Sequence, residues 1–335
     1  MRKVLKGMII FFTVVMIGLL AFMVYVLTRG EDVNILGSAE LMASSEMPAD
    51  EISAVEIKGY SEDIIFKESD TEDIIVKEFA AGKAKKRKAL KVQKTGDTLK
   101  LEIEKRTGSS WFVFGNYHRH IEVYLPASYG GVIDMDVSSG DITSDIDFNV
   151  SKFSINASSG YLSLQDVSAE DITIRTSSGD VKTGQLSGEV KIDCTSGYVE
   201  AESCVGSLDA NTSSGDITIR EMIGEVDVES TSGYLKIEKI DGLASANTSS
   251  GDVIMDFDRL DGDINVNTSS GYVSCDLPDD AEFDFKADTS SGDIDTYFDD
   301  ELSYDRRGSE ARGTVGKGGK KITVKTSSGD IRFTK

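Results

Sequence analysis

The feature that most constrains this chain is a Ser-Gly pair that recurs at a nearly constant interval. The glycines of these pairs are Gly140, Gly160, Gly179, Gly197, Gly215, Gly233, Gly251, Gly271, Gly292 and Gly329. The intervals are 18 to 21 residues, except for the last, which is 37. A fixed period of this size is typical of a solenoid, in which each repeat packs only on its neighbours.

Each repeat contains the pattern of two short strands. The second residue after every one of these glycines is aliphatic, and the residues around it alternate between apolar and polar. A second glycine follows in four repeats, at Gly188, Gly206, Gly224 and Gly242. We therefore expect an all-β fold, a single-stranded parallel β-solenoid with about 18–20 residues per coil. The last interval is expected to span two coils, one of them degenerate at residues 306–316.

The residue after the corner glycine alternates between an acid and a phenol. In the middle of the chain this column reads Asp180, Tyr198, Asp216, Tyr234, Asp252 and Tyr272. Neighbouring carboxylates about 4.8 Å apart would repel by roughly 0.9 kcal/mol per pair even in water. We expect the tyrosines to separate these charges and to donate hydrogen bonds to them. Two alternatives remain: duplication of a 36-residue unit, or a 36-residue coil whose stacked aspartates bind Ca²⁺.

The charge is concentrated in the repeats. The whole chain has a formal net charge of −22, but residues 131–300 contain 9 Lys and Arg against 36 Asp and Glu, a net of −27. Such a surface repels nucleic acid and favours cations or basic partners. Nucleic-acid binding is therefore excluded.

The N-terminus is apolar. Residues 7–28 carry no charge, and Arg2, Lys3 and Lys6 precede them. The length suits a transmembrane helix, and the basic residues favour a cytoplasmic N-terminus with the solenoid outside the cell membrane. We expect residues 1–30 to be a cytoplasmic tip and single-pass membrane anchor; the alternative is a cleavable signal peptide, whose apolar stretch is usually shorter. Residues 31–51 are expected to be a linker, 52–130 the β layers that cap the solenoid, and 131–335 the solenoid itself.

Two segments of the cap region are candidate binding surfaces for a partner or polyanion. The basic segment contains Lys83, Lys85, Lys86, Arg87 and Lys88, and it could bind anionic envelope polymer or lipid. The aromatic segment contains Trp111, Phe112 and Phe114, which could contact a partner or a membrane surface. The alternatives are a solvated basic turn and an aromatic plug for the end of the solenoid.

The sequence offers little for catalysis. The repeated serines have no histidine beside them to act as a base, and the acids recur along the whole repeat rather than forming a local exception. His118, His120 and Glu122 would share one face of a strand, but no second cluster supports a zinc site. The three cysteines fall in apolar or small-residue columns and are expected to be buried, unpaired thiols. We expect no enzyme activity, no cofactor and no metal.

The chain resembles the DUF4097 family of adhesin-like bacterial envelope proteins. The matching features are the serial "SSGD" and "TSGY" corners, the strand "IEVYLPAS" that leads into "DMDVSSGDI", and the apolar N-terminus. This resemblance implies an extracytoplasmic β-solenoid and a link with envelope stress. We expect a membrane-anchored binding or scaffold module whose partners are envelope polymers or other envelope proteins. The alternatives are a polysaccharide-active enzyme and a purely structural spacer.

Overall fold

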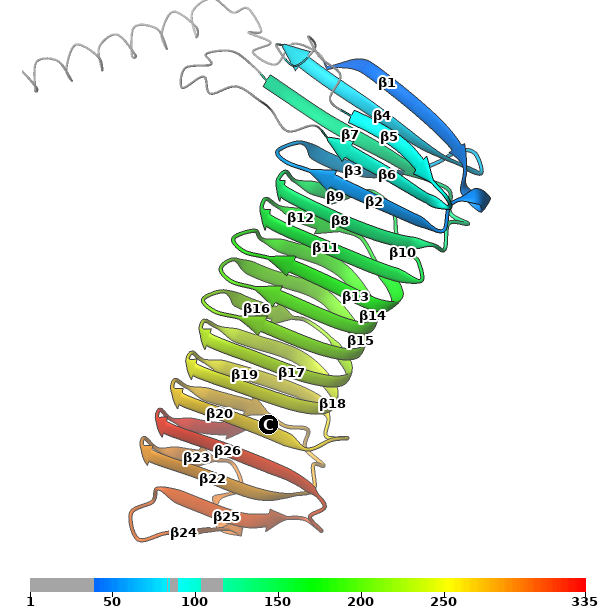
Figure 1. Ribbon diagram of the computed structural model, residues 1–335. Coiled ribbons are helices and arrows are strands. Elements are labelled where there is room, and N and C mark those ends of the chain that lie inside the picture. Colours follow the sequence, from blue (N-terminus) through cyan, green and yellow to red (C-terminus); the bar gives the residue numbers. More distant parts are fainter. Residues whose placement is uncertain (1–38, 83, 85–89, 104–116) are drawn as a thin grey trace, which may run out of the picture.

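The chain forms a long stack of β-coils (Figure 1). The computed structural model describes residues 39–82, 84, 90–103 and 117–335. In the centre of the stack each strand pairs in parallel with the strand one repeat later, so that Val181 lies beside Val199, and Val199 beside Ile217. These partners are 18 residues apart, which confirms the coil length expected from the repeat.

Fourteen strands build the central coils, and most coils combine a short strand with a longer one. These strands are β8 (Val132–Ser139), β9 (Ile142–Ser144), β10 (Phe148–Asn149), β11 (Lys152–Ser159), β12 (Leu162–Leu164), β13 (Val167–Thr176), β14 (Val181–Cys194), β15 (Tyr198–Thr212), β16 (Asp216–Ile219), β17 (Met222–Ser232), β18 (Leu235–Ser250), β19 (Val253–Arg259), β20 (Ile264–Ser270) and β21 (Val273–Asp276). Inward side chains from both strands of each coil form one continuous apolar core. Ile217, Val226 and Val228, for example, are at most 1% exposed.

Close stacking explains why the corner glycines recur in every coil. A Cβ at Gly215 would lie 2.2 Å from the carbonyl oxygen of Gly197, and a Cβ at Gly233 would lie 2.2 Å from that of Gly215. Gly233 also has φ +153°, a backbone conformation that side chains disfavour. The glycine column is therefore required by the contact between coils.

The N-terminal end of the stack is not built in chain order. Its elements are β1 (Glu40–Pro48), η1 (Ala49–Glu51), β2 (Ala54–Gly59), β3 (Asp63–Glu68), β4 (Asp73–Gly82), β5 (Leu90–Thr95), β6 (Thr98–Ile103) and β7 (Tyr117–Leu125). The β2–β3 coil lies between β6–β7 on one side and β8–β9 on the other. Antiparallel β5, β4 and β1 extend the sheets past the last coil. Strand β1 occupies residues that we expected to form a linker.

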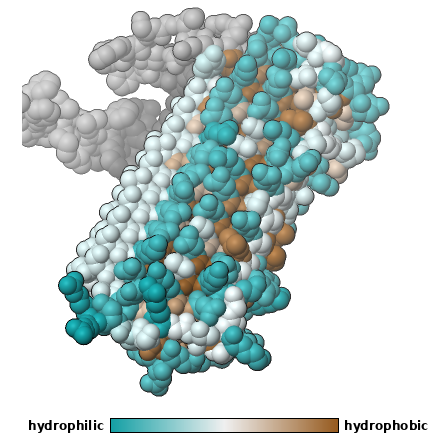
Figure 2. Space-filling model, turned by 60° about the horizontal axis from the view of Figure 1, so that its bottom comes forward, coloured by the Kyte–Doolittle hydropathy of each residue, from teal (hydrophilic) through white to brown (hydrophobic). Residues whose placement is uncertain are grey.

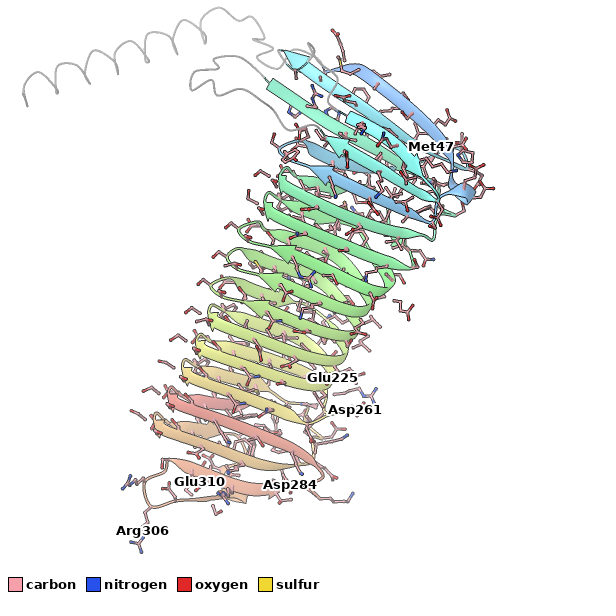
Figure 3. The ribbon with its side chains drawn as sticks, viewed as in Figure 1. Met47, Glu225, Asp261, Asp284, Arg306 and Glu310 are labelled. Carbon is pink, nitrogen blue, oxygen red and sulfur yellow. The ribbon has the colours of Figure 1, made fainter. Side chains whose placement is uncertain are left out.

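The C-terminal end repeats this arrangement. Its elements are β22 (Phe283–Ser291), β23 (Ile294–Thr296), η3 (Asp299–Glu301), β24 (Leu302–Tyr304), β25 (Glu310–Val315), β26 (Lys320–Ser328) and β27 (Ile331–Thr334). The chain passes through β22 and β23, makes the antiparallel hairpin β24–β25, and returns. The β26–β27 coil then inserts between β20–β21 and β22–β23. Arg306 and Glu310 mark the hairpin end in Figure 3.

The 37-residue interval therefore does not contain a degenerate coil. Residues 310–315, which fall within the expected coil, form strand β25, which pairs antiparallel with β22 and β24. The physical reason is that the end of a parallel stack exposes unpaired strand edges. A short antiparallel hairpin covers the edge of β22, and the outer strand that it leaves, β24, is only three residues long.

The expected fold class is wrong in one part. We expected the solenoid to be preceded by a transmembrane helix over residues 7–28, but none of the helices in the described part of the chain has the length and apolar character to span a bilayer. The described helices η1 and η3 are three-residue 3₁₀ turns with no buried residue. Residues 7–28 themselves lie outside the described ranges. The all-β solenoid part of the prediction is confirmed for the described residues.

The cysteine prediction is confirmed. Cys194, Cys204 and Cys275 are free and buried. Burial raises the pKa of Cys204 and of Cys275 to about 12. Burial, together with the nearby carboxylate of Asp180, also raises the pKa of Cys194. All three side chains therefore stay protonated near neutral pH and act as small apolar core residues.

Candidate functional site

A long groove follows the row of Ser-Gly corners. It has a volume of about 980 Å³ and is lined by residues just before the corner glycines in nine coils, from Asn156 to Lys325. At about 4.8 Å per coil, nine coils correspond to a length of roughly 38 Å. Figure 2 shows a pale stripe of intermediate hydropathy along one side of the stack, as expected for columns of Ser, Thr and Gly.

Three columns of side chains shape the groove. The third residue before each glycine forms the floor, and the residues on either side of it form the walls. The floor residues are small and buried: Ala157, Thr176, Cys194, Thr212, Ser230, Thr248, Thr268 and Thr326. One wall consists of Ser and Thr, and the other of Asn156, Arg175, Asp193, Asn211, Glu229, Asn247, Asn267, Asp288 and Lys325. The floor side chains are short, and this leaves a continuous depression.

Hydrogen bonds between coils hold the second wall in place. Arg175 Nε donates to Asp193 Oδ2 at 3.1 Å, and Asn211 Nδ2 donates to Asp193 Oδ1 at 3.3 Å. Farther along, Asn267 Nδ2 donates to Asn247 Oδ1 at 3.0 Å. These bonds run along the groove, across the strands, so that the wall presents a regular row of amides and charges. Such a row is preorganised for a ligand that also extends along the stack.

The floor hydroxyls differ between the two halves of the groove. Thr176 Oγ1 and Thr212 Oγ1 each accept the backbone N–H of their own corner glycine at 2.9 Å. The hydroxyls of Ser230, Thr248 and Thr268, and that of Thr326 beyond them, have no hydrogen-bond partner among the described residues.

Backbone bonding at the corners accounts for this difference. Gly251 N–H donates to the carbonyl of Ser270 at 3.1 Å, and Gly271 N–H donates to that of Ser328 at 3.1 Å. The N–H of each of these glycines therefore bonds to the neighbouring coil and is not donated to the threonine hydroxyl of its own coil.

The groove is nearly neutral on a very acidic solenoid. Its lining contains two basic residues, Arg175 and Lys325, and three acidic ones, Asp193, Glu229 and Asp288, a net of −1. The acidic excess of the repeats therefore lies almost wholly outside the groove. A groove with hydroxyl, amide and mixed-charge walls favours ligands that exchange many neutral hydrogen bonds, and neutral polysaccharides are of this kind.

The Asp–Tyr column has a geometric basis that the sequence interpretation missed. Asp216 Oδ1 accepts the backbone N–H of Tyr234 at 2.8 Å. The same bond joins Asp180 to Tyr198 and Asp252 to Tyr272, each at 2.9 Å. Each of these aspartates thus satisfies a backbone donor in the next coil, next to a corner glycine with positive φ.

The two ends of the column show that alternation is not obligatory. Asp141 N–H donates to Asp63 Oδ1 at 3.1 Å, and Asp293 N–H donates to Asp330 Oδ1 at 3.0 Å. In these places, one aspartate follows another in neighbouring coils. Aspartates of the column therefore accept a backbone N–H both at its ends and in its middle. Tyrosines separate the carboxylates only in the middle.

Other predicted site residues can be placed only in part. The basic segment residues Lys83, Lys85, Lys86, Arg87 and Lys88 lie outside the described residues, as do Trp111, Phe112 and Phe114. Their roles in binding stay predictions. The groove itself was not predicted, although the small residues three places before each glycine were a signal for it.

The histidine face lies on β7, away from the groove. Glu122 accepts Lys67 Nζ at 2.6 Å and the Tyr124 hydroxyl at 2.7 Å. Burial raises the pKa of Glu122, but these two hydrogen bonds outweigh it and hold the pKa below its usual value. His120 stacks on Phe79 at 4.9 Å between ring centroids, and burial lowers its pKa. No group of three potential ligands that could hold a metal occurs in the described part of the chain.

The chain is similar to one family model and to several solved structures. The model of the Toastrack DUF4097 family matches residues 52–223 and again residues 221–334. A "putative adhesin" from Parabacteroides distasonis is 11% identical, with a TM-score of 0.41, and the match covers 89% of this chain and 98% of that one. A "putative cell adhesion protein" from Clostridium sporogenes is 12% identical, with a TM-score of 0.26, covering 89% and 99%. No curated protein matches the chain.

The resemblance inferred from the corner motifs is confirmed by the family match. The two matched stretches together span residues 52–334, which is most of the chain. They also contain all the coils, the groove and the Asp–Tyr column. This chain belongs to the Toastrack DUF4097 family.

Proposed function

We propose that the protein is a non-enzymatic binding module of the bacterial cell envelope, located outside the cytoplasm, whose groove binds a neutral polysaccharide. The observation that carries the proposal is the near-neutral, hydroxyl-lined groove that continues through nine coils. A ligand that fills it must be long and must repeat along its length. An extended sugar chain has both properties, and its hydroxyls match Ser, Thr and Asn side chains as donors and acceptors.

The composition of the groove also favours binding over catalysis. The cysteine on its floor, Cys194, is buried with a raised pKa, so that it is a poor nucleophile. Asp193 is held by Arg175 and Asn211.

The experiment is affinity electrophoresis of the protein in gels that contain neutral polysaccharides, with gels of acidic polysaccharide for comparison. Ser249 lies on the groove wall and is exposed, and Ser249→Trp places a bulky ring in the path of the ligand. We expect this variant to lose at least tenfold in affinity. The matched control is Gln185→Trp, at an exposed residue outside the groove lining. Equal binding by both variants, or no retardation by any neutral polysaccharide, would contradict the proposal.

A role as a spacer is the second candidate, and one observation favours it. Antiparallel strands β1 and β24 lie at the two ends of the stack, so that the parallel coils form a rod with a defined number of layers. A rod of fixed length can hold a bound partner at a set distance from a surface. Duplicating one 36-residue pair of coils, residues 198–233, should leave a spacer functional while changing the distance it sets.

The link with envelope stress that the family resemblance implies is part of the same proposal. Cells exposed to inhibitors of wall synthesis should contain more of this protein than untreated cells, as measured by quantitative immunoblotting. If the amount of the protein did not change under any envelope stress, this part of the proposal would be contradicted. The proposal that the groove binds a polysaccharide would be unaffected.

A further inference from the structure

Two cavities flank the connection between β7 and β8, at the N-terminal end of the stack. One has a volume of about 410 Å³ and lies against Leu125, Phe148 and Val150. The other has a volume of about 820 Å³ and is lined by the end of β1 and by η1. Tyr129 lines both. Met47, which precedes this lining, marks the corner in Figure 3.

The first cavity has an apolar floor. Leu125, Phe148 and Val150 are 3%, 2% and 6% exposed, and Tyr129 is 6% exposed. The hydroxyl of Tyr129 donates to the carbonyl of Val132 at 3.1 Å, so that this polar group is already hydrogen-bonded within the protein. Volumes of this size and an apolar floor are typical of sites that hold a side chain or a small ligand.

Carboxylates surround both cavities. Glu68, Asp145 and Asp147 line the first, and Asp50, Glu72 and Asp73 line the second. Two of the six accept hydrogen bonds: Asp147 from the backbone of Asp166 at 3.3 Å, and Glu72 from the Ser128 hydroxyl at 2.6 Å.

None of the six forms an ion pair with a cation in the described ranges of the chain. Elsewhere on the solenoid, exposed acids such as Asp193, Asp241 and Glu202 do have basic partners. The first cavity thus combines its apolar floor, and the second its buried Ile52 and Tyr129, with a negative rim that no described cation neutralises.

We propose that these two cavities are a docking site for a basic segment of a partner protein, with one Lys or Arg side chain in each cavity. The aliphatic stem of each side chain packs on the apolar floor, and its charged end reaches the rim carboxylates. Charge complementarity favours this occupant, because the floor suits a hydrocarbon stem and the rim suits a cation. Two cavities on either side of one loop match an extended peptide with two cationic residues.

This site is independent of the groove. The groove is nearly neutral, is lined by the corner residues of the central coils, and shares no lining residue with either cavity. A protein could therefore dock at the N-terminal end while a polysaccharide occupies the groove. The polysaccharide proposal can fail without affecting the docking site.

The test uses fluorescence anisotropy with the full chain and a dye-labelled peptide, acetyl-Gly-Lys-Leu-Val-Ser-Lys-Gly-amide, whose two lysines are four residues apart and share one face of an extended chain. Two further peptides carry glutamine in place of one lysine, or glutamate in place of both. We expect the two-lysine peptide to bind at least fivefold more tightly than the one-lysine peptide, and the glutamate peptide not to bind. Raising the salt concentration should weaken binding, because the rim is exposed to screening ions.

The decisive variant is Asp145→Asn combined with Asp147→Asn, which removes two charges from the rim. Asparagine keeps the acceptor that Asp147 offers to the backbone of Asp166, so that the fold is preserved. We expect a loss of affinity of at least tenfold. The matched control is Asp134→Asn combined with Asp136→Asn, on exposed positions of β8 that line neither cavity.

Three outcomes would overturn the proposal. Equal losses in the rim variant and in the β8 control would show attraction to acidic protein in general. Unchanged binding in the rim variant would show that the peptide lies elsewhere. Binding of the glutamate peptide as tightly as the lysine peptide would show that charge plays no part.

Discussion

Replacing Asp216 distinguishes hydrogen bonding from charge separation as the reason for the acidic column. Asp216 Oδ1 accepts the N–H of Tyr234 at 2.8 Å, and its neighbours in the column are Tyr198 and Tyr234. Asp216→Ala removes the acceptor and the charge together. Asp216→Asn removes the charge and keeps an oxygen acceptor of the same shape.

The two explanations predict effects of different sign. Hydrogen bonds with one charged partner contribute about 1.5–3 kcal/mol, and neutral ones about 1 kcal/mol. Because Asp216 is exposed, water replaces part of the lost bond, and we expect Asp216→Ala to lower the free energy of unfolding by about 1–2 kcal/mol. Asp216→Asn should recover at least half of that loss. If the column served only to space charges, removing one carboxylate would be neutral or stabilising.

The assay is urea unfolding followed by circular dichroism at low and at high salt. Tyr234→Phe is the control, because no hydrogen bond of the Tyr234 hydroxyl occurs within the described residues, and it should be nearly neutral. A neutral or stabilising Asp216→Ala would refute the hydrogen-bond explanation. So would an asparagine variant as unstable as the alanine variant.

Three further predictions follow from the stack. Gly215→Ala should prevent close contact with Gly197 and cost more than about 3 kcal/mol, measured by urea unfolding, whereas Gly130→Ala, whose nearest contact would be 3.9 Å, should cost little. The three cysteines should resist alkylation in the folded protein and all react in denaturant without reductant; mass spectrometry showing a disulfide would contradict this. The pKa of His120 is lowered in the folded state, so stability should fall as pH drops below about 6.5, and His120→Gln should flatten that dependence.

The central coils could be predicted from the sequence because they depend on local repetition. The aliphatic residue two places after each corner glycine predicts an inward strand position, and the 18-residue register follows from the glycine spacing. Ile217 and Leu235 pair as this register requires. The recurrence of glycine is a further signal, because each coil needs a residue without a side chain where the backbone of the neighbouring coil lies close.

The stack ends and the groove could not be predicted in this way. The 37-residue interval from Gly292 to Gly329 is compatible either with two coils or with a hairpin and a return, and only pairing across the stack decides between them. The role of Asp216 depended on the backbone of the next coil, which side-chain spacing does not reveal. The groove depends on which columns of side chains turn inward at the corner. The folded backbone decides this, and the spacing of residues in the sequence does not reveal it.

The insertion of β26–β27 has a consequence for the order of folding. Val266 pairs with Val324, 58 residues later, while the intervening β22–β23 coil occupies the next place outward. During synthesis, β22–β23 emerges first, yet it cannot take its final place until residues 320–334 have been made. Growth by adding one coil after another therefore stops at β20–β21, and the remaining three layers must close together as one cooperative step. Such long-range closure is slow, and until it is complete the strand edge of β20–β21 stays exposed to other chains.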